Sequence, residues 1–182
     1  FGQDGDFSQT AIVRRINTDL ANDLGNLGQR VLSFVQKNAG GAVPEPGAFT
    51  TEDRKLLDAG AALLDQLRAE LIGAQAFNRG LESVFSVVAD ANRYVDSQAP
   101  WTLRKTDTVR MCTVLYVLAE TIRRVALLLQ PFMPGSMEKL LDQLAVPAEA
   151  RSFAAFGAAL TPGTALPAPS GVFPRFQDAA AS

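Results

Sequence analysis

The amino-acid sequence predicts an all-α protein, a bundle of four to five helices followed by an irregular C-terminal tail. Apolar residues recur every three or four positions over most of the chain, which is the spacing of one helix face. No segment alternates convincingly between apolar and polar residues with the period of a strand. The chain has 182 residues, 47% of them hydrophobic and 20% charged, which is enough for one domain with a buried core.

The first expected helix follows a turn-like segment, and Ser8 or Asp6 can cap it. The pattern ends at residues 40–41, two glycines followed by a proline-rich loop. Gly25 and Gly28 are costly inside a helix, so we expect a neighbouring helix to approach closely there. The apolar face of this helix is formed by Ile12, Ile16, Leu20, Leu24, Leu27, Val31 and Val35.

A second helix is expected to begin at Thr50 or at the residue after it, because Thr50 and Asp53 have the spacing of a capping box. Gly73 ends or bends this helix. A third helix is expected over residues 75–95. It must end before Pro100, because the residue that precedes a proline avoids helical backbone geometry.

Residues 107–130 form the fourth expected helix, and apolar side chains surround most of its axis. Such a helix is typical of the buried centre of a bundle. Ser136 can cap a short fifth helix over residues 137–144. We then expect a short helix near residues 148–156 and an extended tail. The tail is expected to pack back through Leu160, Leu166, Val172, Phe173 and Phe176.

Several functions are excluded by composition. The chain has no histidine, which removes histidine metal sites, Ser-His-Asp and Cys-His nucleophiles, and histidine-ligated haem. The single cysteine, Cys112, cannot form an internal disulfide and is expected to be a small core residue in a reducing compartment. Phosphate-binding glycine loops are also absent, and we find no catalytic site and no metal site.

The charge balance of 17 basic and 19 acidic residues argues against a strongly basic nucleic-acid coat but allows a small local RNA site. No uncharged apolar run is long enough to span a membrane, and no signal peptide is visible. We therefore expect a soluble, cytoplasmic protein. Since the first residue is Phe1, the chain is expected to be a piece of a longer protein.

The first candidate site is a polar stripe on the first helix. Asn22, Asn26 and Arg30 are four residues apart and share one side of a helix. Asparagine and arginine offer donors and an acceptor to a base edge, and a guanidinium plane can stack on a base. The alternative is an ordinary solvated helix face.

The second candidate site is the segment of residues 92–101, which begins with Asn92 and ends with the only tryptophan, Trp101, at an expected boundary between a helix and a loop. Trp101 is either a core residue or an exposed platform on which an unpaired base can stack. Pro100 would fix the approach of the ring by locking its own φ angle. Arg104 and Lys105, grouped with Arg110, could contact phosphates, although such groups are more often ordinary surface charge.

Four segments in this order resemble the anticodon-binding domain of bacterial methionyl-tRNA synthetases. They are INTDLANDLGNLGQR, ANRYVDSQAPW, LLQPFMPGSMEKLLDQL and a late GVFPRF. The resemblance extends to about Phe176. The synthetases for leucine, isoleucine, valine and cysteine have a similar bundle, but Ala-Pro-Trp after Asn-Arg-Tyr is most similar to the methionine enzyme.

The resemblance implies that the domain grips the CAU anticodon of methionine tRNA. In the family, a tryptophan that matches Trp101, with Pro100 beside it, stacks on the first anticodon base, the C. An asparagine and an arginine that match Asn26 and Arg30 contact anticodon bases. Further RNA contacts are expected from residues near these positions. They are Asn22, Asn92, Arg104 and Lys105.

The resemblance also implies a division of the chain. Residues 1–7 would be the junction from a catalytic domain, residues 8–146 the bundle, and residues 147–182 the short helix and tail. The catalytic domain would bind ATP with Mg²⁺ and carry the family's zinc insert. Its signature motifs are absent here, so this chain alone is expected to bind no cofactor and to activate no methionine. If the native protein ends at this point, it is expected to be a monomer.

A competing hypothesis is a helical interaction bundle without an RNA role. It predicts that Trp101 is buried, and that Asn26 and Arg30 are remote from it or engaged in internal hydrogen bonds. The RNA-binding hypothesis predicts that the three side chains converge on one solvent-accessible site.

Overall fold

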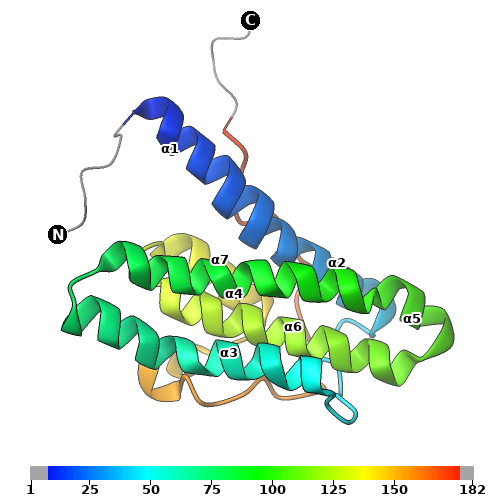
Figure 1. Cartoon of the computed structure of the whole chain (residues 1–182). Helices are drawn as coiled ribbons and strands as arrows, with labels where there is room; N and C mark the ends of the chain where they lie inside the picture. The colour runs from blue at the N-terminus through cyan, green and yellow to red at the C-terminus, as the bar shows by residue number, and fades with distance from the viewer. Residues whose placement is uncertain (1–7, 177–182) are drawn as a thin grey trace, which may run out of the picture.

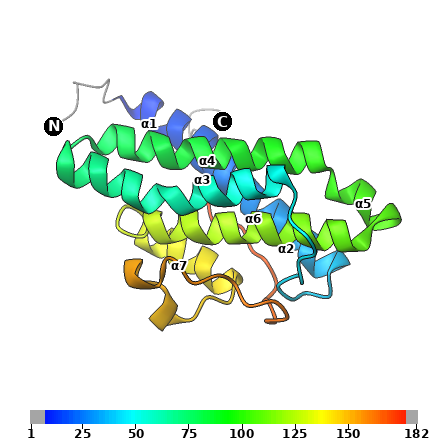
Figure 2. The same ribbon diagram turned by 60° about the horizontal axis from the view of Figure 1, so that its bottom comes forward.

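The computed structural model describes residues 8–176, and this part of the chain is helical apart from loops, turns and one isolated β-bridge. The predicted all-α fold is confirmed. The helices are α1 (Gln9–Arg15), α2 (Asn26–Asn38), α3 (Thr51–Arg68), α4 (Phe77–Gln98), α5 (Pro100–Thr106), α6 (Thr108–Leu129) and α7 (Pro134–Gln143). Helices α3, α4 and α6 lie side by side, and the long rod of α1 and α2 crosses them obliquely (Figures 1 and 2).

Helix α6 forms the centre of the bundle, as its sequence predicted. Almost all of its side chains beyond the first turn are buried, and α2, α3, α4, α5 and α7 all pack against it. Asp107 caps it, because the Asp107 carboxylate accepts a hydrogen bond of 2.9 Å from the backbone N–H of Arg110. Cys112 is partly buried and packs against the core, and this burial raises the pKa of its thiol.

The first expected helix is continuous but not α-helical throughout. Residues Ile16–Gly25 form a π-helical segment between α1 and α2. A Cβ atom on Gly25 would lie 2.9 Å from the carbonyl oxygen of Leu20 and 3.2 Å from the ring of Phe173, so glycine is required where the tail crosses. The close helix approach expected at the second glycine is confirmed, since a Cβ on Gly28 would lie 3.3 Å from Leu140 of α7.

The capping box of α3 is confirmed. The Asp53 carboxylate accepts a hydrogen bond of 2.9 Å from the backbone N–H of Thr50, and the hydroxyl of Thr50 accepts from the N–H of Asp53. Helix α4 ends at Gln98, before Pro100 as predicted. The sequence did not reveal that Pro100 begins a separate short helix, α5, after Ala99 takes a left-handed conformation with φ of 44°.

The region after α6 differs from the prediction in three places. Helix α7 begins at Pro134 rather than after Ser136, because proline is well suited to the first position of a helix. The short helix expected over residues 148–156 is replaced by two separate 3₁₀ turns, Ala148–Ala150 and Phe153–Ala155. The side chain of Phe176, expected to pack against the bundle, is 59% exposed.

The tail nevertheless packs back against the bundle. It pairs with the loop after α2 through the Ala42–Ala165 bridge, where the N–H of Val43 donates to the carbonyl of Thr164 at 2.8 Å. Leu160 and Leu166 are buried as predicted. The tail then reaches the π-helical segment, where Asn17 exchanges two hydrogen bonds with the backbone of Phe176.

A buried ion cluster fastens the start of the tail to α6. Glu120, 1% exposed, pairs with Arg123 and Arg124 one turn along the same helix. Glu120 also accepts a hydrogen bond of 3.1 Å from the N–H of Leu160, and Arg123 donates to the carbonyl of Phe156. Arg123 is therefore buried inside the bundle, and Arg124 is partly buried beside it with its guanidinium paired to Glu120.

Candidate nucleic-acid interface

Helices α2 and α5 bring Arg30 and Trp101 together. The guanidinium carbon of Arg30 lies over the indole, 5.8 Å from the ring centroid, which is within the range of a cation–π contact. Nη2 of Arg30 also donates a hydrogen bond of 2.9 Å to the carboxylate of Asp96 near the end of α4. The Trp101 side chain is 43% exposed. Trp101 is therefore not a core residue, so the burial predicted by the competing hypothesis is wrong, whereas the internal hydrogen bond that it predicted for Arg30 is present.

The position of the indole follows from the sharp connection between α4 and α5. The left-handed Ala99 reverses the chain, and its carbonyl accepts hydrogen bonds from the N–H groups of Thr102 and Leu103. Pro100 is buried at the first position of α5. Trp101 follows as the second residue, so the short helix presents its ring to solvent beside α2.

The polar stripe of the first helix is exposed along the same rod. Asn26 begins α2 one helical turn before Arg30, and its side chain is exposed. Asn22 lies in the π-helical segment, so the regular α-helical spacing assumed for the stripe holds only from Asn26 onward. The Asn22 carboxamide oxygen accepts a hydrogen bond of 2.7 Å from Arg175 of the tail.

Arg175 is the residue that the sequence prediction missed. It comes from the far end of the chain, and its guanidinium joins the polar stripe through Asn22. The sequence contained a hint of this role, since Arg175 is the only charged residue of the late GVFPRF segment. That this segment and the polar stripe are neighbours becomes visible only in the structure, where the tail packs along the long rod of α1 and α2.

The other candidate RNA contacts differ in what engages them. The side-chain amide of Asn92 donates to the carbonyl of Val88 at 3.1 Å and more weakly, at 3.4 Å, to that of Asp23. Arg104 on α5 donates a hydrogen bond of 3.1 Å to the carboxamide oxygen of Asn38 at the end of α2. Lys105, the next residue on α5, is exposed.

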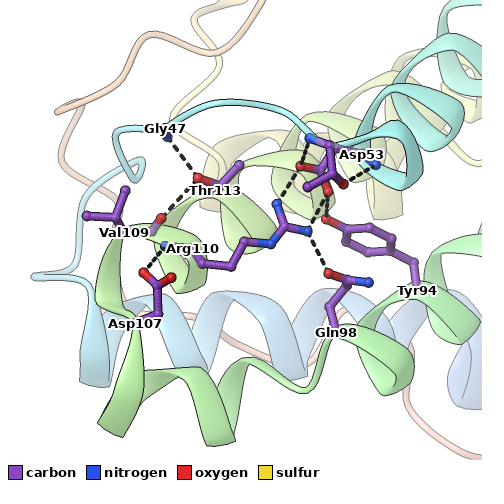
Figure 3. Close-up of polar contacts among 9 residues, drawn as sticks. Gly47, Asp53, Tyr94, Gln98, Asp107, Val109, Arg110 and Thr113 are labelled. Carbon is purple, nitrogen blue, oxygen red and sulfur yellow. Dashed lines mark hydrogen bonds and ion pairs between the residues drawn. The ribbon is translucent and has the colours of Figure 1, made fainter.

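A part-buried network lies where α4 ends and α6 begins, on either side of α5 (Figure 3). Arg110 donates to both carboxylate oxygens of Asp53, one at 2.7 Å, and also to the carboxamide oxygen of Gln98. The hydroxyl of Tyr94 donates to the same carboxylate. The sequence grouped Arg110 with Arg104 and Lys105, but Arg110 is engaged in this internal network.

The network shifts the ionisation of its members. Burial of the Asp53 carboxylate raises its pKa, but the hydrogen bonds from Arg110, Tyr94 and the Thr50 backbone outweigh burial, and the pKa falls to about 2. Burial and the bond to Asp53 raise the pKa of Tyr94. The bond to Asp53 raises the pKa of Arg110. At neutral pH the network therefore joins a carboxylate, a guanidinium and a neutral phenol.

Two other properties of residues 8–176 bear on function. Within that range, no group of three or more cysteine, aspartate or glutamate side chains is arranged to hold a metal ion. None of the helices described there combines the length and the apolar character needed to cross a lipid bilayer.

Residues 43–182 match a family model described as the anticodon binding domain of methionyl tRNA ligase. The chain is 56% identical over 180 residues to the methionine–tRNA ligase of Brucella suis biovar 1, and 53% identical over 181 residues to that of Mycobacterium bovis. These alignments cover 98% and 97% of this chain but 35% of each relative. The chain thus spans about a third of the length of the curated relatives it matches.

Solved structures agree with the sequence comparisons. The free form of Mycobacterium tuberculosis methionyl-tRNA synthetase superposes with a TM-score of 0.93 at 52% identity, over 97% of this chain and 36% of that one. The bundle, its tail and the motif-bearing helices described above thus have the fold of a methionyl-tRNA synthetase segment. The chain belongs to the methionyl-tRNA ligase family, of which it is the anticodon-binding domain.

Proposed function

We propose that this domain binds the anticodon loop of methionine tRNA and reads its CAU sequence, with Trp101 and Arg30 at the centre of the site. Asn26 and Pro100 complete the proposed anticodon contacts, and Asn22, Asn92, Arg104 and Lys105 are proposed as further contacts. The observation that carries the proposal is the half-exposed indole of Trp101 with the guanidinium of Arg30 over its ring.

The chemistry of the pair suits a single-stranded base. A loop base can be splayed out, stacked on an aromatic ring and read along its Watson–Crick edge. Cytosine presents one amino donor and two acceptors on that edge. Arg30 can donate to the acceptors, and the exposed carboxamide of Asn26 can accept from the amino group. Uracil would place a carbonyl oxygen opposite that acceptor and leave it unpaired.

The longer protein is proposed to be a cytoplasmic methionine–tRNA ligase that attaches methionine to its tRNA with ATP. Its ATP and Mg²⁺, and the zinc of the family's insert, would bind outside the segment represented by this chain. The residues described here would contribute recognition of the anticodon loop and no chemistry on methionine.

The direct test is a titration of the chain with an RNA stem-loop that carries CAU, against a UAU control, at fixed low salt. Trp101 is the only tryptophan, so a change in indole fluorescence reports on this position. We expect strong quenching by CAU and much weaker quenching by UAU. Equal responses to the two loops would contradict anticodon reading. If labelled RNA bound without any change in fluorescence, the site would lie elsewhere.

Replacing Trp101 by alanine is expected to weaken binding of the CAU stem-loop by about 1–3 kcal/mol, the value of one stacked base. Because the variant lacks the indole, binding is measured by fluorescence anisotropy of labelled RNA. Phe153→Ala removes another exposed aromatic side chain, on the tail, and serves as the matched control. An equal loss in the two variants would mean that Trp101 makes no specific stacking contact.

Replacing Arg30 by lysine is expected to reduce discrimination between CAU and UAU by about 1–3 kcal/mol, because lysine cannot form the planar set of hydrogen bonds. The loss should fall on the CAU loop, and because the positive charge is kept, affinity for the UAU loop and the salt dependence should change little. Competition of unlabelled stem-loops against a labelled CAU loop measures both quantities. A uniform loss for the two loops, with unchanged discrimination, would assign Arg30 to phosphate contact instead.

A further inference from the structure

We propose that Asp53, Arg110 and Gln98 form a positioning device for Trp101, which holds the indole in place before RNA arrives. The inference rests on the proposed anticodon function and adds residues that contact no RNA themselves. The three side chains come from α3, α6 and α4, and none of them belongs to α5, the helix that carries the tryptophan.

The first support is that the network joins the residues on either side of α5. Helix α5 has seven residues and is joined to its neighbours by one residue on each side, Ala99 and Asp107. Gln98 is the last residue of α4, and Arg110 lies in the first turn of α6. The bond from Arg110 to Gln98 therefore links the two flanks of α5 directly (Figure 3).

The second support is the way Asp53 fixes Arg110. The two nitrogens of the guanidinium donate to the two carboxylate oxygens, so the plane of the Arg110 side chain is set by α3. The Asp53 carboxylate is fully buried and is itself held by Tyr94 and by the capping box of α3. The same Nη2 that donates to Asp53 thus also donates to Gln98, from a fixed direction.

The third support is the conformation of Ala99. A left-handed backbone with φ of 44° is unfavourable for alanine and persists when the structure on both sides enforces it. On one side the side chain of Gln98 is held by Arg110, and on the other Pro100 is buried. Release of Gln98 would let Ala99 relax. Because Trp101 is two residues further on, its ring would then lose a defined position beside Arg30.

The test compares Gln98→Ala with Gln130→Ala, which removes another half-buried carboxamide at the far end of α6. Time-resolved anisotropy of Trp101 is measured in the RNA-free proteins. Gln98→Ala is expected to increase the nanosecond motion of the indole and to lower affinity for the CAU stem-loop by about two- to tenfold, the contribution of one hydrogen bond. Gln130→Ala is expected to leave both unchanged.

Two more variants separate positioning from general loss of structure. Gln98→Glu keeps an acceptor for Arg110, so the indole of the RNA-free variant is expected to move no more than in the wild-type chain. Asp53→Asn leaves the Gln98 side chain intact but weakens the hold on Arg110. At a temperature where circular dichroism shows it folded, it is expected to mobilise the indole as Gln98→Ala does.

Unchanged indole motion in both Gln98→Ala and folded Asp53→Asn would overturn the proposal. So would indole motion increased equally by Gln130→Ala, since the effect would then be general. If the wild-type chain failed to bind either stem-loop, the proposed function would fail. The RNA-free anisotropy would still decide whether the network positions Trp101.

Discussion

Replacing Glu120 by alanine is expected to lower the free energy of unfolding by about 3–5 kcal/mol, the cost of removing one partner from a buried ion cluster. Arg123, 3% exposed, would lose its counter-charge inside the bundle, and Arg124 would lose its ion pair. The N–H of Leu160 would also lose its acceptor. The loss thus affects both the centre of α6 and the attachment of the tail.

Urea denaturation followed by circular dichroism measures this effect, with Glu138→Ala on the exposed face of α7 as the control. The control is expected to change stability by about 0.5 kcal/mol or less. Glu120→Gln keeps an acceptor for Leu160 and should lie between the two. Limited proteolysis near residues 156–160 should also accelerate in Glu120→Ala. Equal stabilities of Glu120→Ala and Glu138→Ala would refute a role of the cluster in stability.

Replacing Asp53 by alanine is the second large effect, again about 3–5 kcal/mol, because Arg110 and Tyr94 would both lose a buried partner. The capping box of α3 would also lose one of its two hydrogen bonds. Asp65→Ala, on the exposed face of the same helix, is the matched control and should be nearly neutral. Thermal and urea unfolding of the two variants at pH 7 provide the comparison.

The same carboxylate makes stability depend on pH. The pKa of Asp53 falls from an ordinary 3.8 to about 2, so the unfolded chain takes up this proton before the folded chain does. The resulting stabilisation, about 2 kcal/mol, is complete above the unfolded pKa and is lost as the pH falls from about 4 to about 2. The stability gap between wild type and Asp53→Asn should therefore narrow over this interval. A constant gap would mean that Asp53 ionises normally in the folded chain.

Local patterns in the sequence were sufficient to predict the helices of the central bundle. The Thr50–Asp53 capping box and the apolar pattern of residues 107–130 each depend on neighbours within a few positions. Proline was read correctly as the end of α4 but not as the start of α5 or α7. Proline disrupts the interior of a helix but is favoured at its first position, so a proline in the sequence is compatible with either the end or the start of a helix.

Local patterns did not predict the π-helical segment, nor which side chains Arg104 and Arg110 contact. Apolar spacing over Ile16–Gly25 fits an ordinary helix, and the change of hydrogen-bond register accompanies contact with the tail residue Phe173. Arg104 and Arg110 are similar in sequence context, yet Arg104 is exposed and Arg110 pairs with Asp53. Their difference depends on α3, more than forty residues earlier in the chain.

Helix periodicity and the order of the motifs are properties of the linear chain, so they were sufficient to predict the all-α class, the central helix and the family. The packing of the helices and the tail determines three further features: Trp101 is exposed, Arg30 lies over the indole and donates to Asp96, and Arg175 joins the polar stripe. These are contacts between segments far apart in the chain. Their geometry is fixed by how helices pack, which no local pattern encodes.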